Sequence, residues 1–345
     1  MFIIKELFME KIRVGIIGAG RIGRVHSESL CQRIPEAEVV AISDKFVDSA
    51  KKLAAEYGIP NVYDDYHKIL EDPTIEAVFV CSPTNTHADI AMEAAKAGKH
   101  IFCEKPIDTS VEKILKTKKV VEEAGVKMQI GFNRRFDHNF RKIHALAESG
   151  ALGDIQIVKI TSRDPEPPSA EYAAASGGMF LDMTIHDFDM ACYQAGSAVD
   201  EVYAVGTVTV DPKIGEAGDI DTAVVTLKMK NGVTCVIDNC RQAVYGYDQR
   251  VEVFGRKGCA AASNDTETNV VVSTATAVSS DKPLFFFLER YKQSFSDEAR
   301  EFIKAVQTGC DVPVSIDDGL QPIMIAKAAN LSMKENRPVK LSEIL

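Results

Sequence analysis

The sequence predicts two domains: an α/β domain with a doubly wound parallel sheet, and an α+β domain with a large, mainly antiparallel open sheet. Strand and helix patterns alternate as far as Gly131, which is typical of a parallel sheet with crossover helices. Beyond Gly131, strand patterns follow one another without helices between them, which indicates an antiparallel sheet. We therefore expect one domain in residues 1–131 and a second in residues 132–345, whose terminal helices can pack back on the first domain.

Length and composition agree with two domains and disfavour several kinds of partner. The chain has 345 residues, of which 46% are hydrophobic, enough for two cores. Its net charge of -10 disfavours nonspecific binding to nucleic acid or to an anionic membrane. No apolar run reaches the roughly 18 residues of a membrane-spanning helix. We expect a cytoplasmic protein, with Met9 as an alternative start of translation.

The eight cysteines give no sign of a metal site. They are scattered, mostly among apolar residues, without C-x-x-C pairs or metal-like spacing. We expect buried, reduced thiols.

The first strand leads into a glycine-rich loop. A β-branched run over residues 13–17 is followed by G-x-G-x-x-G at 18–23 and by a helix pattern to about Arg33, as in a dinucleotide-binding Rossmann fold. The first glycine makes the tight turn, the second lets the backbone approach a pyrophosphate, and the third lets the helix pack on the strand. The predicted phosphate-binding residues, at a helix N-terminus, are Gly18, Gly20, Arg21, Ile22 and Gly23.

An acidic residue ends the second strand pattern. Asp44 follows the strand at 39–43 and stands 21 residues beyond Gly23. A carboxylate in this place accepts hydrogen bonds from the ribose hydroxyls and would repel a 2′-phosphate. The sequence therefore predicts NAD as the cofactor, although the neighbouring cation Lys45 leaves NADP open. Asp44 can also cap the helix that starts near Phe46.

Two further loops follow strand ends at the same edge of the predicted sheet. The strands at 77–81 and 100–103 end in Ser-Pro-Thr-Asn-Thr-His and Glu-Lys-Pro, respectively. Because loops after the carboxyl ends of strands line the cofactor crevice, we expect six residues to contact the cofactor: Ser82, Thr84, Asn85, His87, Glu104 and Lys105. His87 can equally cap the following helix. Lys105 can also donate to a substrate hydroxyl and stabilise a developing oxygen anion, and the Lys105–Pro106 bond can be cis.

The second half contains six strand patterns and two terminal helices. The strands are expected at 155–162, 202–210, 222–230, 233–238, 250–254 and 270–274. The turn Lys-Asn-Gly at 230–232 predicts a hairpin. Helices are expected at 289–306 and 318–336, and the first carries apolar residues at helical spacing that we interpret as core: Phe295, Ala299, Phe302, Ile303 and Val306.

Residues 177–187 read Gly-Gly-Met-Phe-Leu-Asp-Met-Thr-Ile-His-Asp. The glycines let the backbone approach a ligand, and the apolar run after them predicts a helix that ends at Gly196. Asp182 and His186 are four residues apart and therefore share a helix face. A carboxylate and an imidazole on one rigid element can act as a general base with its orienting partner, although an isolated D-x-x-x-H is more often a solvent-facing pair. Residues 169–176 are small and polar and can form a lid.

Together these motifs resemble the glucose-fructose oxidoreductase / inositol dehydrogenase (Gfo/Idh/MocA) family, over nearly the whole chain from Lys11. The marks are the glycine loop followed by His26, Glu-Lys-Pro at 104–106 and G-G-x-x-x-D-x-x-x-H at 177–186, in this order. Within the family the chain is most similar to inositol 2-dehydrogenases, through Phe-Cys-Glu-Lys-Pro at 102–106, Gly-Phe-Asn-Arg-Arg-Phe-Asp at 131–137 and Tyr-Gly-Tyr-Asp at 245–248.

The resemblance implies oxidation of the axial hydroxyl of myo-inositol to the 2-keto product, by hydride transfer to NAD, in a homotetramer built through the second-domain sheets. Lys105, Asp182 and His186 would be catalytic, with no metal. These three residues would also bind the substrate, together with Arg135, Asp164, Tyr245 and Tyr247.

Two of these assignments have open alternatives. Arg163-Asp164-Pro165 departs from the Arg-Asn-Pro of relatives, and because a carboxylate accepts but does not donate hydrogen bonds, the preferred polyol can differ. Arg135 can instead form an ion pair with Asp137 or Glu171.

Three other functions remain compatible with the family. The first is a dehydrogenase of glucose or another aldose, and the second is an NAD-dependent glycosidase, in which oxidation is transient. The third is an NAD-binding regulator without enzyme activity. The intact set of Lys105, Asp182 and His186 favours ordinary dehydrogenation over the last two.

Overall fold

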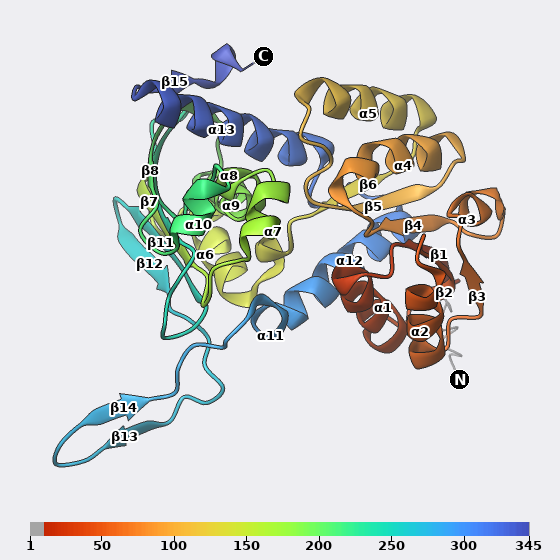
Figure 1. The fold of residues 1–345 in the computed structure, drawn as a ribbon, viewed down its shortest axis with the longest axis horizontal. Helices are drawn as coiled ribbons and strands as arrows, with labels where there is room; N and C mark the ends of the chain where they lie inside the picture. The colour runs from red at the N-terminus through yellow and green to blue at the C-terminus, as the bar shows by residue number, and fades with distance from the viewer. Residues whose placement is uncertain (1–9, 345) are drawn as a thin grey trace, which may run out of the picture. The chain divides into compact units, whose positions relative to one another are not determined.

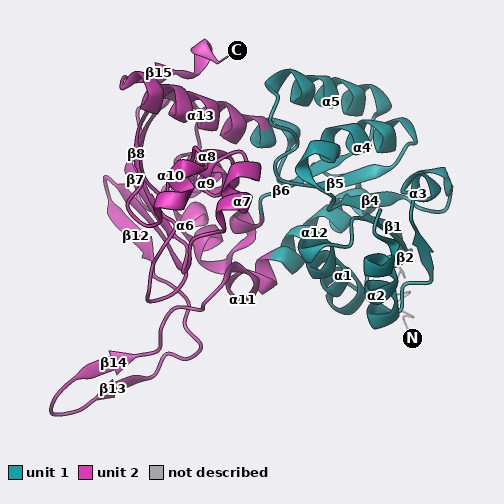
Figure 2. Ribbon diagram, in the orientation of Figure 1, with its two compact units in different colours: residues 1–132, 295–319 teal, residues 133–294, 320–345 magenta. Residues whose placement is uncertain are grey.

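The computed structural model describes residues 10–344, so the alternative start at Met9 lies outside the described part of the chain. The described chain forms two compact units (Figures 1 and 2). Unit 1 comprises the chain up to Phe132 together with Phe295–Gly319, and unit 2 comprises Asn133–Ser294 together with the chain from Leu320. The first unit is therefore completed by a segment that follows most of the second in sequence.

Unit 1 is built on a six-stranded parallel sheet of order β3-β2-β1-β4-β5-β6. Its strands are β1 (Ile12–Ile17), β2 (Ala37–Ser43), β3 (Asn61–Tyr63), β4 (Ala77–Val80), β5 (His100–Glu104) and β6 (Met128–Gly131). The order reverses between β1 and β4, which makes the carboxyl ends of these strands the topological switch point, where ligands bind in such sheets. The predicted doubly wound α/β fold is confirmed.

Helices cover both faces of this sheet (Figure 1): α4 and α5 lie on one face, and α1, α2 and α12 on the other. The helices of unit 1 are α1 (Arg21–Arg33), α2 (Val47–Tyr57), α3 (His67–Glu71), α4 (Thr84–Lys96), α5 (Val111–Ala124) and most of α12 (Lys292–Thr308). Ala299, Phe302 and Ile303 of α12 are buried in the same core cluster as β1 and β4. The interpretation of the apolar positions of this helix as core is confirmed.

Unit 2 contains a seven-stranded sheet of order β12-β11-β7-β10-β9-β8-β15, in which only β10 and β7 are parallel neighbours. Its strands are β7 (Ile155–Arg163), β8 (Val199–Thr207), β9 (Thr222–Met229), β10 (Thr234–Cys240), β11 (Asp248–Gly255), β12 (Gly258–Ala262) and β15 (Val339–Lys340). The mainly antiparallel sheet is confirmed, as is the hairpin through Gly232, which has a positive φ of 91°.

The helices of unit 2, of which α6 and α9 contact this sheet, leave large apolar side chains exposed on its strands. They are η1 (Asn133–Phe136), α6 (His138–Glu148), α7 (Ala170–Ala175), α8 (Met179–Asp182), α9 (Ile185–Ala195), α10 (Pro212–Glu216), α11 (Phe287–Arg290), η2 (Leu341–Glu343) and most of α13 (Ile316–Glu335). The exposed apolar side chains on the sheet strands are Ile157, Tyr203, Val205, Val224 and Phe254.

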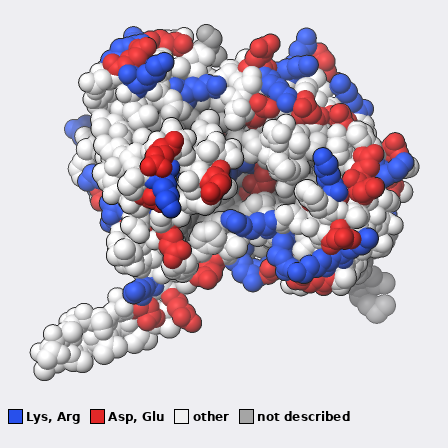
Figure 3. Space-filling model, in the orientation of Figure 1, with Lys and Arg blue, Asp and Glu red and all other residues white. Residues whose placement is uncertain are grey.

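The prediction that residues 270–274 join the main sheet is wrong. β13 (Val271–Ser273) pairs with β14 (Val278–Ser280) in a separate two-stranded sheet, which projects from unit 2 as an arm (Figure 1). Val271 is 60% exposed and Val278 is 73% exposed. Between Glu267 and Asp281 the arm carries no charged side chain, and it is therefore white in Figure 3. An apolar run predicts that a segment forms a strand, but residues distant in sequence determine which sheet that strand joins.

The cysteine prediction is confirmed in part. All eight cysteines are free, and Cys81, Cys103 and Cys235 are buried. Cys31, Cys259 and Cys310 are exposed, so for these three the prediction of burial is wrong, because apolar neighbours in sequence do not determine which face a residue occupies. Within residues 10–344, no helix is both long enough and apolar enough to cross a bilayer.

Candidate functional site

The glycine loop of unit 1 has the geometry of a phosphate-binding turn. Gly18 has a φ of +106°, and a Cβ there would lie 2.6 Å from the carbonyl of Cys81. A Cβ on Gly23 would lie 2.0 Å from the Gly18 oxygen, whereas one on Gly20 would meet no atom within 4 Å. Gly18 and Gly23 are therefore needed for close packing. Gly20 faces open space at the start of α1, where the backbone N–H groups favour an anion. These residues fit a dinucleotide.

Asp44 lies beside this loop, as predicted from its position after β2. Its Oδ2 accepts a hydrogen bond of 2.7 Å from the Ala19 amide, and its Oδ1 accepts one of 2.7 Å from the Phe46 amide. The carboxylate therefore fixes the glycine loop and the entry to α2. Because a carboxylate has about four acceptor sites, it can still receive ribose hydroxyls. Lys45 is exposed.

The loops after β4 and β5 are tied to each other. Nδ1 of His87 lies 2.8 Å from the Pro106 carbonyl oxygen, and Nε2 lies 2.7 Å from that of Ser82. His87 is only 2% exposed, so its ring holds these two loops in place. Thr84 and Asn85 form the first turn of α4. The predicted cis bond between Lys105 and Pro106 is confirmed.

In unit 2, the paired glycines and the segment after them form a tight bend. Gly177 and Gly178 have φ values of 86° and 88°, a region that side chains disfavour. A Cβ on Gly178 would also lie 3.1 Å from Oδ1 of Asp219, which accepts a hydrogen bond from the Met179 amide and so begins α8. The predicted single helix is in fact two, α8 with Asp182 and α9 with His186, separated by Met183 and Thr184.

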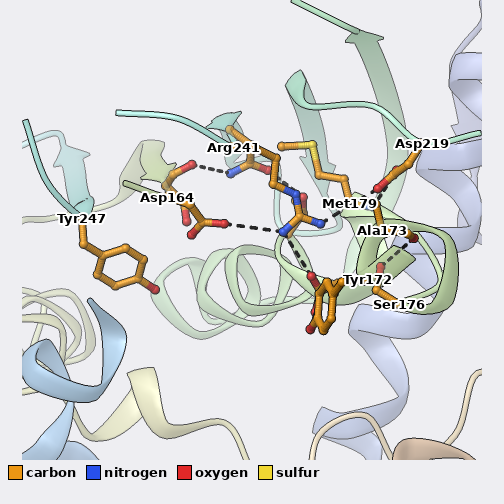
Figure 4. A network of polar contacts seen from close by, with 12 residues as sticks. Asp164, Tyr172, Ala173, Ser176, Met179, Asp219, Arg241 and Tyr247 are labelled. Carbon is orange, nitrogen blue, oxygen red and sulfur yellow. Dashed lines mark hydrogen bonds and ion pairs between the residues drawn. The ribbon is translucent and has the colours of Figure 1, made fainter. Parts of the chain in front are cut away.

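A buried arginine joins two of the predicted substrate residues (Figure 4). Nη1 of Arg241 lies 3.1 Å from Oδ2 of Asp182 and 3.5 Å from Oδ2 of Asp164. The Tyr172 hydroxyl donates a hydrogen bond of 2.9 Å to the other Asp182 oxygen. Arg241 is 3% exposed, so its charge acts in an environment of low dielectric constant. Asp164, Asp182, Arg241 and Tyr172 thus form one polar network.

Arg241 and Tyr172 are site residues that the sequence analysis missed. Arg241 follows β10, whose last residue Cys240 pairs with Arg163 of β7, so Arg241 and Asp164 leave neighbouring strands at the same end. That pairing is parallel and joins residues far apart in sequence, and a correct strand order would have been needed to find it. Tyr172 lies on α7, within the segment that was predicted to form a lid.

Burial raises the pKa of Asp164 to about 6, against the opposing effect of Arg241. An unfolded aspartate titrates near about 3.9. Between these two values the folded state binds more protons than the unfolded state, so this residue lowers stability as the pH rises from about 4 to about 6.

Replacing Asp164 by Asn is therefore expected to stabilise the protein above pH 6, by about 1–3 kcal/mol, and to have little effect near about pH 4. Urea unfolding of the wild type and of Asp164→Asn across this range measures the difference. A difference that is constant with pH, or that grows as the pH falls, would contradict the assignment.

Three predicted substrate residues have other partners in the structure. Arg135 forms an ion pair with Asp189, with Nη2 2.6 Å from Oδ1, so an ion pair is present, with a partner that the prediction did not name. The Tyr245 hydroxyl donates to Asp248 at 2.6 Å. The Tyr247 hydroxyl accepts from Nη2 of Arg134 at 3.3 Å and is buried.

Arg134, which precedes Arg135, anchors α9. Nη1 of Arg134 lies 2.6 Å from Oδ1 of Asp187, and the Asn239 amide donates to the other oxygen at 2.9 Å. Asp187 is fully buried and follows His186 directly in α9. This buried ion pair therefore fixes the start of the helix that carries His186.

Two family models match the chain. Residues 12–132 match "Oxidoreductase family, NAD-binding Rossmann fold", and residues 140–261 match "GFO/IDH/MocA C-terminal domain". Unit 1 therefore has the fold of an NAD-binding domain.

Curated relatives and solved structures cover almost the whole chain. The uncharacterized oxidoreductase YrbE of Bacillus subtilis is 52% identical over 96% of this chain and 97% of its own length. Myo-inositol 2-dehydrogenase of Thermotoga maritima is 47% identical over 97% of this chain and 100% of its own. The crystal structure of scyllo-inositol dehydrogenase from Lactobacillus casei with bound NAD(H) and scyllo-inositol superposes with a TM-score of 0.89, at 30% identity, over 96% of this chain and 100% of its own.

Proposed function

The chain belongs to the GFO/IDH/MocA family of oxidoreductases, and from this premise we propose that it oxidises a secondary hydroxyl of a cyclic polyol with NAD. The proposed substrate is myo-inositol, and the proposed product is its 2-keto derivative. The observation that carries the proposal is the network in which Arg241 holds Asp164 and Asp182 together. Two neighbouring carboxylates can accept hydrogen bonds from several hydroxyls of one ring. A closed site with such groups penalises ligands that leave them unpaired.

In the proposed reaction, His186 accepts the proton of the hydroxyl that is oxidised, while hydride leaves the same carbon. Bound NAD would accept that hydride at its nicotinamide ring. Asp182 orients the imidazole and receives a substrate hydroxyl, while Tyr172 and Arg241 hold its carboxylate. Lys105 donates to the reacting oxygen and stabilises its negative charge as the proton leaves. The proposal requires Lys105 of unit 1 and His186 of unit 2 to reach the same oxygen.

The cofactor proposal rests on Asp44, which we assign to the ribose hydroxyls. Replacing it by Asn removes the charge that repels a 2′-phosphate and weakens a hydrogen bond to a charged group, worth about 1.5–3 kcal/mol. We expect kcat/KM for NAD to fall by about 10- to 100-fold and the preference for NAD over NADP to shrink. Initial rates with each cofactor measure this. An unchanged preference would remove Asp44 from cofactor selection, and Lys45→Ala tests whether the neighbouring cation supports NADP.

We also propose a homotetramer that buries the exposed apolar side chains of the unit 2 sheet, since large exposed apolar patches mark association surfaces. Val224→Lys and Phe254→Lys place charges on this surface. Light scattering should then report a smaller assembly than the wild type forms. A monomeric wild type would contradict the proposal.

The activity is tested by incubating the protein with NAD or NADP and one of four substrates: myo-inositol, scyllo-inositol, chiro-inositol or glucose. NADH absorbance with myo-inositol at mildly alkaline pH is the expected result. Turnover of glucose without turnover of any cyclitol would instead favour a sugar dehydrogenase of the same family. Binding of NAD without turnover of any of the four would contradict the proposed activity.

A further inference from the structure

Unit 1 encloses three ionisable side chains that the proposed mechanism does not use: His26 of α1, Glu104 at the end of β5 and Glu298 of α12. His26 and Glu298 are fully buried, and Glu104 is 7% exposed. One nitrogen or oxygen atom from each lies within 4.8 Å of the others. Burying two carboxyl groups together is strongly unfavourable unless their charge is neutralised.

The two carboxyl groups differ in their contacts. Nε2 of His26 lies 2.6 Å from Oε1 of Glu104. Neither carboxyl oxygen of Glu298 has a hydrogen-bond partner among the described residues. The rings of Phe79, Phe102 and Phe295 surround His26, so the cluster has an apolar environment. Burial, followed by the charge of Glu104, raises the pKa of Glu298 well above its ordinary value.

A metal ion is a poorer explanation of the cluster than a proton. Two ligands of one tetrahedral ion, each about 2.1 Å from it, lie roughly 3.4 Å apart. The 2.6 Å between His26 and Glu104 is instead a hydrogen-bond distance. The remaining carboxyl group, Glu298, can become neutral by holding its own proton.

We propose that Glu298 is a neutral carboxylic acid in the folded protein and that the neighbouring His26–Glu104 pair positions Lys105. Glu104 directly precedes Lys105, so a fixed Glu104 side chain restrains the backbone from which the lysine extends. Gly131 of β6 pairs with Glu104 of β5, and a Cβ on Gly131 would lie 3.1 Å from the Glu104 carboxylate. The side chain of any other residue at position 131 would therefore take up part of the space that the Glu104 carboxylate occupies. The positioning role rests on the proposed function of Lys105; the neutrality of Glu298 does not.

Infrared spectroscopy of the full protein at mildly alkaline pH tests the neutral acid without measuring activity. The wild type should show the carbonyl stretch of a protonated carboxylic acid, and Glu298→Gln should lose it. Glu123→Gln, at an exposed position of α5, is the matched control and should retain it. Absence of the band from the wild type would overturn the proposal. So would a metal ion that purifies with the wild type and is lost from Glu298→Gln.

Kinetics with NAD and myo-inositol test the positioning role. A displaced catalytic group can cost on the order of 10²-fold in rate, and Glu104→Ala should therefore lower kcat by about that factor while KM for myo-inositol changes little. Glu298→Gln keeps the shape and neutrality of the acid and should retain a kcat close to that of the wild type. An unchanged kcat in Glu104→Ala would overturn the positioning role.

His26 provides a second pair of variants if Glu104→Ala does not fold. His26→Gln can keep a nitrogen donor toward Glu104, whereas His26→Leu cannot, so the first should retain more of kcat. Equal, wild-type kcat values for both would overturn the positioning role. If Lys105→Ala itself remains active, the proposed function of Lys105 fails, while the infrared result still decides the state of Glu298.

Discussion

The His186→Ala variant is expected to lose between about 10²- and 10⁴-fold of kcat, the range that general-base catalysis supplies. The imidazole is the proposed acceptor of the hydroxyl proton, and its removal leaves no equivalent base on α9, whose first residues include the buried, ion-paired Asp187. Binding of NAD should be unchanged, because the glycine loop and Asp44 belong to unit 1. Initial rates of NAD reduction and a fluorescence titration with NADH measure the two quantities.

His138→Ala is the matched control for this experiment. His138 belongs to the same unit, but its side chain is 67% exposed and lies near Asp137 and Asp265, neither of which belongs to the Arg241 network. We expect its kcat to match that of the wild type. A His186→Ala variant within about threefold of the wild type in kcat would remove His186 from the mechanism.

The Arg134→Met variant should show the largest loss of stability. It removes the guanidinium from a carboxylate that is fully buried, and such a loss typically costs about 3–5 kcal/mol because a charge stays buried without its partner. Asp187 would keep the Asn239 amide as a donor, but no cation. Urea unfolding monitored by circular dichroism measures the change.

Two further variants separate burial from the mere loss of an ion pair. Arg13→Met breaks a pair with Glu38 whose side chains are 41% and 51% exposed, and it should cost less than about 1 kcal/mol. Arg134→Met combined with Asp187→Leu removes the buried charge as well and should recover part of the lost stability. Equal losses in Arg134→Met and Arg13→Met would contradict this account of the buried pair.

Features determined by local chemistry could be predicted from the sequence. The glycine loop is an example, because Gly18 requires a positive φ and Gly23 a contact that excludes a Cβ. The place of Asp44 beside that loop follows from its position at the end of β2. The fold class of unit 1 could likewise be predicted, because the alternation of strand and helix patterns is a local feature of the sequence.

Features determined by contacts between distant residues could not be predicted. Arg241 joins the site because β10 pairs with β7 in parallel, which no local pattern indicates. Arg134 and Arg135 are neighbours in the 3-10 helix η1 and point to different partners, Asp187 and Asp189, so the sequence alone could not show which one lies near Tyr247. The arm formed by β13 and β14 has a strand pattern, but nothing in that pattern excludes it from the main sheet.

The most direct test of the central claim uses myo-inositol that carries deuterium on the carbon with the axial hydroxyl. If hydride passes from that carbon to NAD while His186 takes the hydroxyl proton, mass spectrometry will find the deuterium in the NADH formed, and turnover will be slower than with unlabelled substrate whenever hydride transfer limits the rate. Deuterium that appears in water, or NADH that forms without it, would contradict the proposed transfer.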